Sequence, residues 1–168
     1  MAHLHVDPAR AESGLELYWK DEAGGWRMIP RRADVGDAAA CAGIVRAWLD
    51  GLTWMPEGGP SAAALTEIIA EAIPQRAFWV IGDPVAGYLS FKEDENLIAG
   101  LYTATPGTGA GKALVDQVKA GRDFVQLWTH EPNTAAHRFY HREGFVTVER
   151  RAEGRGDGVP ELRMEWRA

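Results

Sequence analysis

The amino-acid sequence predicts a mixed α/β domain built around one sheet, and two features of the sequence carry that prediction. Short apolar runs of strand length, bounded by turn residues, alternate with longer stretches in which apolar residues recur at helical spacing. The length of 168 residues, with 46% hydrophobic and 25% charged residues, suits one globular domain. We expect residues 1–14 to be a flexible leader and residues 15–168 to form the domain.

The first half of the domain predicts a hairpin followed by two helices. Residues 15–20 and 26–31 flank a glycine-containing turn, which is typical of a hairpin. Asp37 is expected to cap a helix that ends near Gly51, because the intervening apolar residues follow a helical spacing. Ser61 is expected to begin the second helix. The predicted buried face of that helix consists of Leu65, Ile68, Ile69 and Ala72.

The second half predicts strands and helices in alternation. Three apolar runs separated by turn residues predict an antiparallel meander at residues 78–81, 85–91 and 97–103. One helix then follows the glycine-rich turn at 107–111, and another begins at Asn133 and closes at Gly144. The remaining strands are expected at residues 124–129, 146–150 and 161–166.

Charge and cysteine content narrow the classes of function and location. The net charge of −6 disfavours nucleic acid or an anionic membrane as a partner and favours cationic ligands. No stretch approaches the roughly 18 unbroken apolar residues of a membrane helix, and the N-terminus lacks the apolar segment of a secretory signal. Cys41 is the one cysteine and lies on an apolar helix face, where a buried thiol is expected. These features predict a cytoplasmic protein.

The segment Thr-Pro-Gly-Thr-Gly-Ala-Gly-Lys-Ala-Leu at 105–114 lies between a predicted strand and a predicted helix. Glycines at such a junction let backbone N–H groups approach a phosphate, and the helix N-terminus adds a favourable dipole. An ATP-binding P-loop is disfavoured, because Pro106 and Ala113 stand where that motif requires Gly and Ser or Thr. Lys112 stands where a dinucleotide-binding motif requires its third glycine. When this segment is considered alone, a second interpretation stays open, in which the turn links the strand to the helix and binds nothing.

A second segment further along the chain strengthens the functional interpretation. Residues 133–145 read Asn-Thr-Ala-Ala-His-Arg-Phe-Tyr-His-Arg-Glu-Gly-Phe. Together with Gly-Ala-Gly-Lys-Ala-Leu at 109–114, this segment resembles the two cofactor motifs of the GNAT superfamily of acetyl-CoA-dependent N-acetyltransferases. That family usually has Arg or Gln three residues before the first glycine, and Pro106 stands there in this sequence. Phosphate binding would then rest on backbone amides and the helix end.

The resemblance implies a fold and a reaction. The fold is a central, mostly antiparallel sheet whose middle strands splay apart, flanked by about four helices. The reaction transfers an acetyl group from acetyl-CoA directly to an amine, in a ternary complex with a small molecule or a peptide N-terminus. Dimers are common in the family. For this sequence, the resemblance implies that acetyl-CoA is bound by the following residues: Leu101, Tyr102, Thr103, Thr108, Gly109, Ala110, Gly111, Lys112, Ala113, Asn133 and Tyr140.

Tyr140 is the candidate general acid. It lies seven residues after Asn133 on a predicted helix, so both side chains can face the cofactor together. A phenol is protonated at pH 7 and can supply a proton to the leaving thiolate. Because the predicted strand at 97–103 carries no carboxylate, the general base stays open between a chain of water molecules and the side chains of Glu57, Glu95, His130 and Glu131.

Two other classes of function stay open. An acyl-CoA-binding module without turnover fits the missing Arg or Gln and the missing strand carboxylate. A degenerate nucleotide-binding protein fits the glycine-rich turn taken by itself. His137 and His141 have the spacing of metal ligands, but without a third ligand no metal site is expected. Trp48 lies in the region that lines the family's acceptor pocket, and we expect it in the core.

Overall fold

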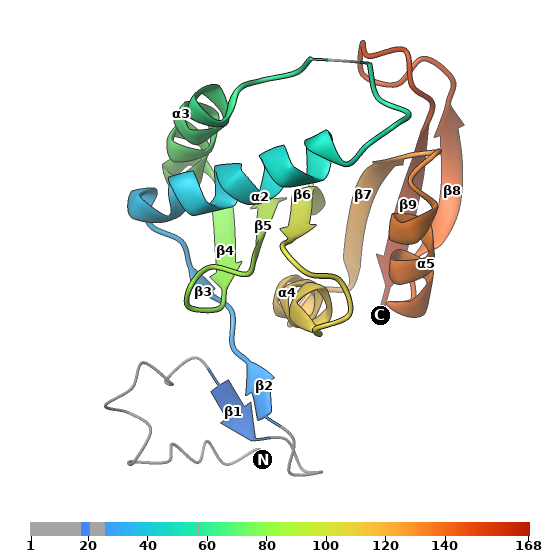
Figure 1. The fold of residues 1–168 in the computed structure, drawn as a ribbon. Helices are drawn as coiled ribbons and strands as arrows, with labels where there is room; N and C mark the ends of the chain where they lie inside the picture. Colours follow the sequence, from blue (N-terminus) through green and yellow to red (C-terminus); the bar gives the residue numbers. More distant parts are fainter. Residues whose placement is uncertain (1–17, 21–25, 57) are drawn as a thin grey trace.

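A seven-stranded sheet organises the protein (Figure 1) in a computed structural model that describes residues 18–20, 26–56 and 58–168. Neighbouring strands are antiparallel except β6 and β7, which run parallel, so the predicted mixed α/β fold with a mostly antiparallel sheet is confirmed. The expected leader at 1–14 lies outside the described residues. In spatial order the strands are β3 (Arg31–Arg32), β4 (Ala77–Ile81), β5 (Gly87–Lys92), β6 (Leu97–Thr103), β7 (Phe124–His130), β9 (Glu161–Arg167) and β8 (Val146–Arg151).

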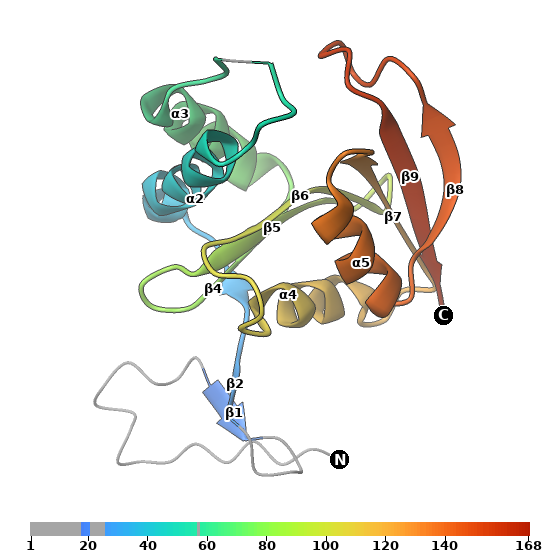
Figure 2. The same cartoon turned by 45° about the vertical axis from the view of Figure 1, so that its right-hand side comes forward.

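The helices of the described chain cover both faces of this sheet (Figure 2). They are α2 (Ala38–Asp50), α3 (Ala62–Ala72), α4 (Ala110–Lys119) and α5 (Thr134–Arg142), with two short 3-10 helices, η2 (Val35–Asp37) and η3 (Ile73–Gln75). Helices α2 and α3 lie on one face, and α4 and α5 lie on the other. Strand β4 shows the division: Phe78 and Val80 pack with α2 and α3, whereas Ala77 and Ile81 belong to the core on the α4 side.

The N-terminal hairpin forms a sheet of its own. Strands β1 (Tyr18–Lys20) and β2 (Trp26–Met28) pair with each other as predicted, and the turn between them lies outside the described residues. The prediction of one continuous strand over 26–31 was wrong. Pro30 has no amide hydrogen for a sheet, and the chain changes partner there, so that Arg31–Arg32 pairs with β4. Met28 packs against the main core and connects the hairpin to it.

The predicted helix start at Ser61 and the predicted cap at Asn133 are confirmed, whereas the predicted cap at Asp37 is wrong. The Ser61 hydroxyl accepts a hydrogen bond from the Ala64 amide, and the Asn133 side chain caps α5 in the same way. Asp37 makes no side-chain cap to α2. Its carboxylate instead accepts two hydrogen bonds from the Arg31 guanidinium, at 2.7 and 2.8 Å, and one from the amide of Asp34, at 2.9 Å. This ion pair joins β3 to the start of α2.

The predicted buried face of α3 is correct in part. Leu65 and Ile69 are buried, and Ile73 continues the same stripe just beyond the helix. Because these residues recur every four positions, the stripe winds away from Ile68, which is 55% exposed.

Other side chains bear on the classes of function considered above. Cys41 is fully buried, and burial raises the pKa of its thiol to about 12, so it is a core residue as predicted. The rings of His137 and His141 bind the backbone carbonyls of His130 and Phe145, and the described residues include no cluster of three metal-ligating side chains. Within the described chain, no helix combines the length and the apolar character needed to cross a membrane.

The Arg31–Asp37 ion pair yields a stability prediction. Hydrogen bonding from Arg31 holds the pKa of Asp37 below its ordinary value. Asp37→Asn should lower the unfolding free energy at pH 7 by about 1–3 kcal/mol, as for hydrogen bonds to a charged group. The Asp37 contribution is present above the pKa of the unfolded state, near roughly 4, and disappears as pH falls through the lower folded-state pKa. Urea unfolding at pH 7 and pH 3 measures both effects.

The matched control is Asp50→Asn, which breaks an exposed ion pair with Arg46 one turn apart on α2. This substitution should lower the unfolding free energy by about 0.5 kcal/mol or less. If both variants lose the same unfolding free energy at pH 7, the Arg31–Asp37 ion pair stabilises the fold no more than an exposed pair does.

Candidate active site

The central strands β6 and β7 pair only briefly and then part. Their parallel pairing consists of Leu97 with Gln126 and Ile98 with Leu127. The register between β5 and β6 shifts at the same point, because Phe91 faces Ile98 while Ser90 faces Gly100. Ala99 is therefore an extra residue, and such a bulge bends its strand. The bend opens a wedge between the carboxyl ends of β6 and β7.

A cavity of about 290 Å³ occupies this wedge. The walls come from β6, β7 and α5, together with the C-terminal part of α2 and the connection between β8 and β9. Its lining residues are Trp48, Ile98, Ala99, Gly100, Leu101, Tyr102, Leu127, Trp128, Thr129, His130, Asn133, Ala136, Tyr140, Arg155, Asp157 and Glu161. Residues from distant parts of the sequence therefore meet at the splayed strands.

The wedge exposes one backbone edge of β6. Residues 99–103 lie beyond the last pair with β7, so on that side their N–H and C=O groups have no strand partner. Leu101 and Tyr102 line the cavity, as expected from the sequence. Thr103 lies just past it, close to the start of α4, where a Cβ built on Gly111 would be 3.8 Å from the Thr103 methyl group. The open edge thus leads from the cavity to the glycine-rich turn.

The glycine-rich turn presents free backbone amides. Gly107 and Gly109 have φ angles of 81° and 86°, which glycine adopts without strain, and a Cβ at either position would meet no atom within 4 Å. The first helical hydrogen bond of α4 runs from the Ala113 amide to the Gly109 carbonyl, at 3.0 Å. The amides of Ala110, Gly111 and Lys112 precede it and have no acceptor inside the helix. They form a site suited to an anion.

The side chains at this turn contribute less than its backbone. The Lys112 ammonium lies 2.8 Å from Asp116 and 3.5 Å from Glu143, so carboxylates already offset its charge. The Thr108 hydroxyl donates to the Thr105 carbonyl at 3.2 Å. The Ala113 amide is engaged within α4 and is not available to an anion.

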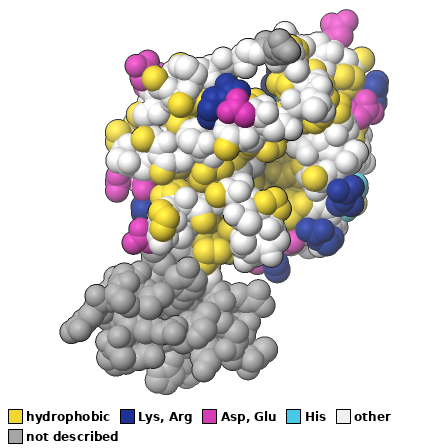
Figure 3. Space-filling model, in the orientation of Figure 1, with side chains coloured by type: hydrophobic (Ala, Val, Ile, Leu, Met, Phe, Trp, Pro, Cys, Tyr) yellow, Lys and Arg dark blue, Asp and Glu magenta, His cyan; other side chains and the backbone are white. Residues whose placement is uncertain are grey.

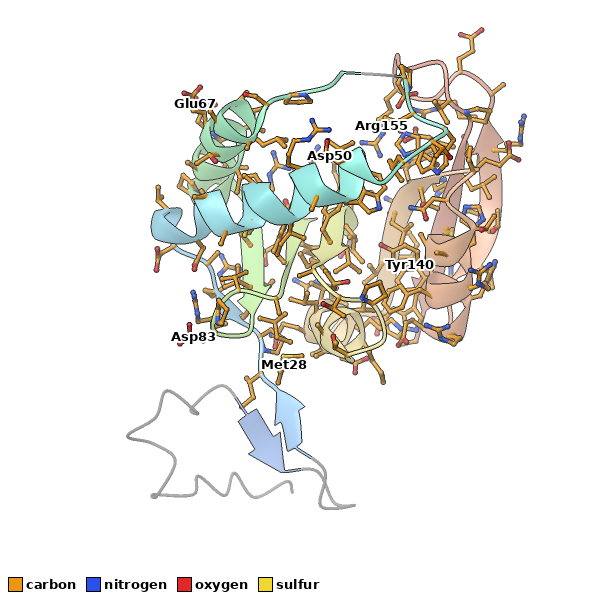
Figure 4. All side chains as sticks on the ribbon, in the orientation of Figure 1. Met28, Asp50, Glu67, Asp83, Tyr140 and Arg155 are labelled. Atoms are coloured by element: carbon orange, nitrogen blue, oxygen red, sulfur yellow. The ribbon has the colours of Figure 1, made fainter. Side chains whose placement is uncertain are left out.

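Asn133 and Tyr140 both line the cavity, as their seven-residue spacing predicts. The Asn133 Oδ1 accepts from the Ala136 amide at 3.2 Å, which leaves its NH₂ group as a donor. Tyr140 is only 7% exposed and packs edge-on against Phe139 and Phe145. Figure 4 shows Tyr140 between α5 and β7. Burial raises the pKa of its phenol, so the hydroxyl stays protonated at neutral pH.

His130, the last residue of β7, is held by Asp157 from the β8–β9 connection. Its Nε2 lies 2.8 Å from Asp157 Oδ2, and Asp157 Oδ1 accepts from the Val159 amide at 2.9 Å. The Val159 amide first, and then His130, hold the pKa of Asp157 below its ordinary value. An ionised Asp157 can only accept, so the His130 Nε2 carries a proton, which leaves Nδ1 as the acceptor whenever the ring is uncharged. The ring also packs against Trp54, with centroids 5.3 Å apart.

The sequence model of the Acetyltransferase (GNAT) domain matches residues 60–168. The chain belongs to the GNAT acetyltransferase family. Its fold agrees with solved structures, although no curated protein matches its sequence significantly. The apo-form of YjaB from Escherichia coli is 18% identical, with a TM-score of 0.66 over 82% of this chain and 95% of that chain.

Two further structures show the same fold. Ribosomal-protein-alanine N-acetyltransferase from Brucella melitensis is 16% identical, with a TM-score of 0.65 over 84% of this chain and all of that chain. The yncA protein from Salmonella typhimurium, solved with its cofactor acetyl-CoA, is 19% identical. Its TM-score is 0.63 over 84% of this chain and 94% of that chain.

Among the candidate bases of this GNAT domain, His130 lines the cavity. Glu131 lies outside the cavity lining and forms two hydrogen bonds with Arg150, at 2.7 and 2.9 Å. Glu95 sits in the turn before β6, where it pairs with Lys92 at the closed end of the wedge. Glu57 lies outside the described residues.

The sequence patterns misplaced one aromatic residue of this GNAT domain's cavity and missed three charged ones from the segment that leads into β9. Trp48 was expected in the core, but it is half-buried and lines the cavity, edge-on to Tyr102 and Trp54. The others are Arg155, Asp157 and Glu161. No local motif marks them, because the pairing of β9 with β7 is what brings this segment to the wedge.

A second cavity of about 370 Å³ lies on the other side of β6, beneath α2 and α3. It shares Ala99, Gly100 and Tyr102 with the first cavity, so the bulged part of β6 separates the two. The buried Ser90 hydroxyl lines it and has no hydrogen-bond partner among the described residues. In the space-filling view of Figure 3, hydrophobic side chains gather near the middle of the visible face, below α2.

Proposed function

We propose that this protein is an N-acetyltransferase that moves the acetyl group of acetyl-CoA directly to an amine within a ternary complex. One observation carries the proposal: an unpaired strand edge passes a buried tyrosine in the wedge and leads to a turn of free amides at a helix N-terminus. The acceptor class expected from the sequence is a small molecule or a peptide N-terminus, and the expected location is the cytoplasm.

The glycine-rich turn fits a diphosphate. The amides of Ala110, Gly111 and Lys112 are unpaired at a helix N-terminus, where the dipole favours negative charge. The space beside Gly107 and Gly109 is free of protein atoms, so phosphate oxygens can approach the backbone. Because Pro106 replaces the usual Arg or Gln, backbone amides supply most of the binding in this proposal.

The open edge of β6 fits the pantetheine arm. An extended arm that contains amides can bind a free strand edge through the same hydrogen bonds that a neighbouring strand would make. Residues 99–103 present such an edge, and it runs from the cavity toward the glycine-rich turn. The diphosphate would lie at the turn, and the acyl end would then reach Tyr140.

The residues of the wedge supply the proton transfers. Bound acetyl-CoA supplies a thioester, which is reactive toward an uncharged amine. Most amines are protonated at pH 7, so a group near the acceptor must remove a proton, and we assign this role to His130, which lines the cavity. The protonated phenol of Tyr140 donates toward the sulfur as negative charge develops there.

A non-catalytic acyl-CoA-binding module is the second candidate. Pro106 in the phosphate turn and the absence of a carboxylate on β6 favour it. Release of free thiol from acetyl-CoA, measured with a panel of primary amines, separates the two. Binding without amine-dependent thiol release would support the binding module.

Acetyl-CoA should stabilise the protein against heat, whereas ATP with magnesium should not. The turn offers amides for a diphosphate, but Ala113 provides no hydroxyl to hold magnesium. At about a hundred times its Kd, acetyl-CoA should add about 2.7 kcal/mol to the unfolding free energy. Differential scanning fluorimetry with each ligand tests this, and stabilisation by ATP alone would remove the acyltransferase proposal.

Gly109→Ala should weaken acetyl-CoA binding about tenfold or more, or about 1.4 kcal/mol. The added methyl group would project into the space beside the free amides, where no protein atom lies within 4 Å. Gly121→Ala is the matched control. Gly121 also has a positive φ, 72°, and open surroundings, but it follows the other end of α4. Calorimetric titration of both variants separates backbone strain from ligand contact, and equal Kd values would show that the diphosphate binds elsewhere.

Tyr140→Phe should lower kcat by roughly 100-fold, the usual contribution of a positioned acid, while the Michaelis constant for acetyl-CoA changes little. Phenylalanine keeps the ring and its packing against Phe139 and Phe145, so the fold should persist. Tyr88→Phe, in the core on the other face, is the control and should retain kcat. A Tyr140→Phe enzyme with wild-type kcat, where chemistry limits the rate, would leave this tyrosine with a packing role only.

A further inference from the structure

Glu161, the first residue of β9, is a buried carboxylate with one oxygen that lacks a hydrogen-bond partner among the described residues. It is 5% exposed and lines the cavity, and the oxygen in question is Oε2. The Arg155 Nε lies 3.6 Å from that oxygen, close enough for an ion pair but beyond hydrogen-bond distance, so the oxygen still lacks a donor. A buried carboxylate oxygen without a donor is costly, so a cationic donor entering the cavity would be bound favourably.

The surroundings of Glu161 also favour a cation. His130 is its direct neighbour across the β7–β9 pair, and the Asp157 bound to His130 adds a second negative charge. Trp54 packs on the His130 ring, and Trp48 stands edge-on to Trp54 with centroids 6.1 Å apart. Aromatic faces beside carboxylates attract cations through the ring quadrupole as well as through charge.

The position of Glu161 sets it apart from the point of acetyl transfer. The acyl end, in the proposed function, lies in the wedge between β6 and β7. Glu161 belongs to β9, which is on the far side of β7 in the sheet. Adjacent strands are roughly 4.8 Å apart, so Glu161 meets a part of the acceptor about that far from the reacting nitrogen.

We infer that the acceptor is a primary amine with a second cationic group a few bonds away, and that Glu161 binds this second group. The inference rests on the proposed function, because it names the acceptor of the same site. A short aliphatic diamine is the simplest molecule with this chemistry.

Arg155 offers the competing interpretation. Its side chain is half-exposed, at 49%, and Figure 4 shows it near the C-terminal end of α2. If Arg155 were the main recognition group, the acceptor would carry a carboxylate instead of a second ammonium. If Arg155 merely lies near Glu161, its removal should leave diamine binding unchanged or stronger.

Three probes of matched chain length distinguish these cases: 1,4-diaminobutane, n-butylamine and 4-aminobutanoate. They differ only in a far group that is cationic, neutral or anionic. With the wild-type protein and acetyl-CoA, the kcat/KM for the diamine should exceed that for butylamine by tenfold or more. Calorimetric titration of the protein with each probe, without acetyl-CoA, should give the same order of affinity.

The decisive variant is Glu161→Gln, which keeps the shape of the side chain and removes its charge. It should lose most of the preference for the diamine in both assays, while the Kd for acetyl-CoA stays unchanged. Glu165→Gln is the matched control. It makes the same change in net charge on the same strand, at a residue paired with Arg163 and Arg167, and should keep the preference. Thermal unfolding of each variant verifies its fold.

The outcomes separate the inference from the proposed function. Thiol release with all three amines at similar kcat/KM would keep the acetyltransferase and overturn the diamine inference. Preference for 4-aminobutanoate, lost in Arg155→Ala, would also overturn it. No thiol release with any probe, together with tight diamine binding that Glu161→Gln abolishes, would remove the acetyltransfer and keep the cation site.

Discussion

The early end of pairing between β6 and β7 is the constraint on which the whole site depends. Two strands in the middle of a sheet share only two residue pairs before they part, and the bulge at Ala99 turns β6 away at that point. Backbone groups along the wedge are then left without ladder partners inside the domain. Such groups cost free energy until water or a ligand satisfies them. The opening therefore favours a ligand that can form the hydrogen bonds of a missing strand, as the proposed function requires.

Chain topology brings helix N-termini to the same opening. Because β6 and β7 are parallel, their carboxyl ends lie at one edge of the sheet, and the helix that follows each strand, α4 or α5, begins there. Both helix N-termini contribute partial positive charge at this edge. The side chains contribute little, since Asp116 and Glu143 offset Lys112. This explains how a chain of net charge −6 can offer a site suited to an anion. Backbone dipoles supply the positive potential that an arginine side chain supplies in other anion sites.

The sequence predicts those features that depend on neighbours along the chain. The bounds of β6, the turn into α4 and the shared face of Asn133 and Tyr140 follow from local patterns, and the structure agrees with each. The bulge at Ala99 could not be predicted, because it exists only relative to β5. Likewise, Asp157 and Glu161 reach the wedge through the register of β9 on β7, which no local pattern encodes. Asp37 was misassigned as a helix cap because its actual partner, Arg31, belongs to a two-residue strand too short to recognise.

The raised pKa of Tyr140 restricts how the proposed reaction can move protons. Burial makes the tyrosinate costly, with the neighbouring Tyr102 phenol adding to that cost, so Tyr140 cannot remain deprotonated after it donates. Its proton must therefore be replaced as it leaves, or stay largely on oxygen in a hydrogen bond to the sulfur. His130 has a separate task, because its acceptor nitrogen is fixed by an ionised Asp157 whose low pKa keeps the pair in one tautomer. The two groups come from different elements of the cavity lining, α5 and β7, and in the proposed reaction they act on different partners. In the proposed reaction, His130 would withdraw the proton that blocks the amine, and Tyr140 would stabilise the charge that develops on the leaving sulfur.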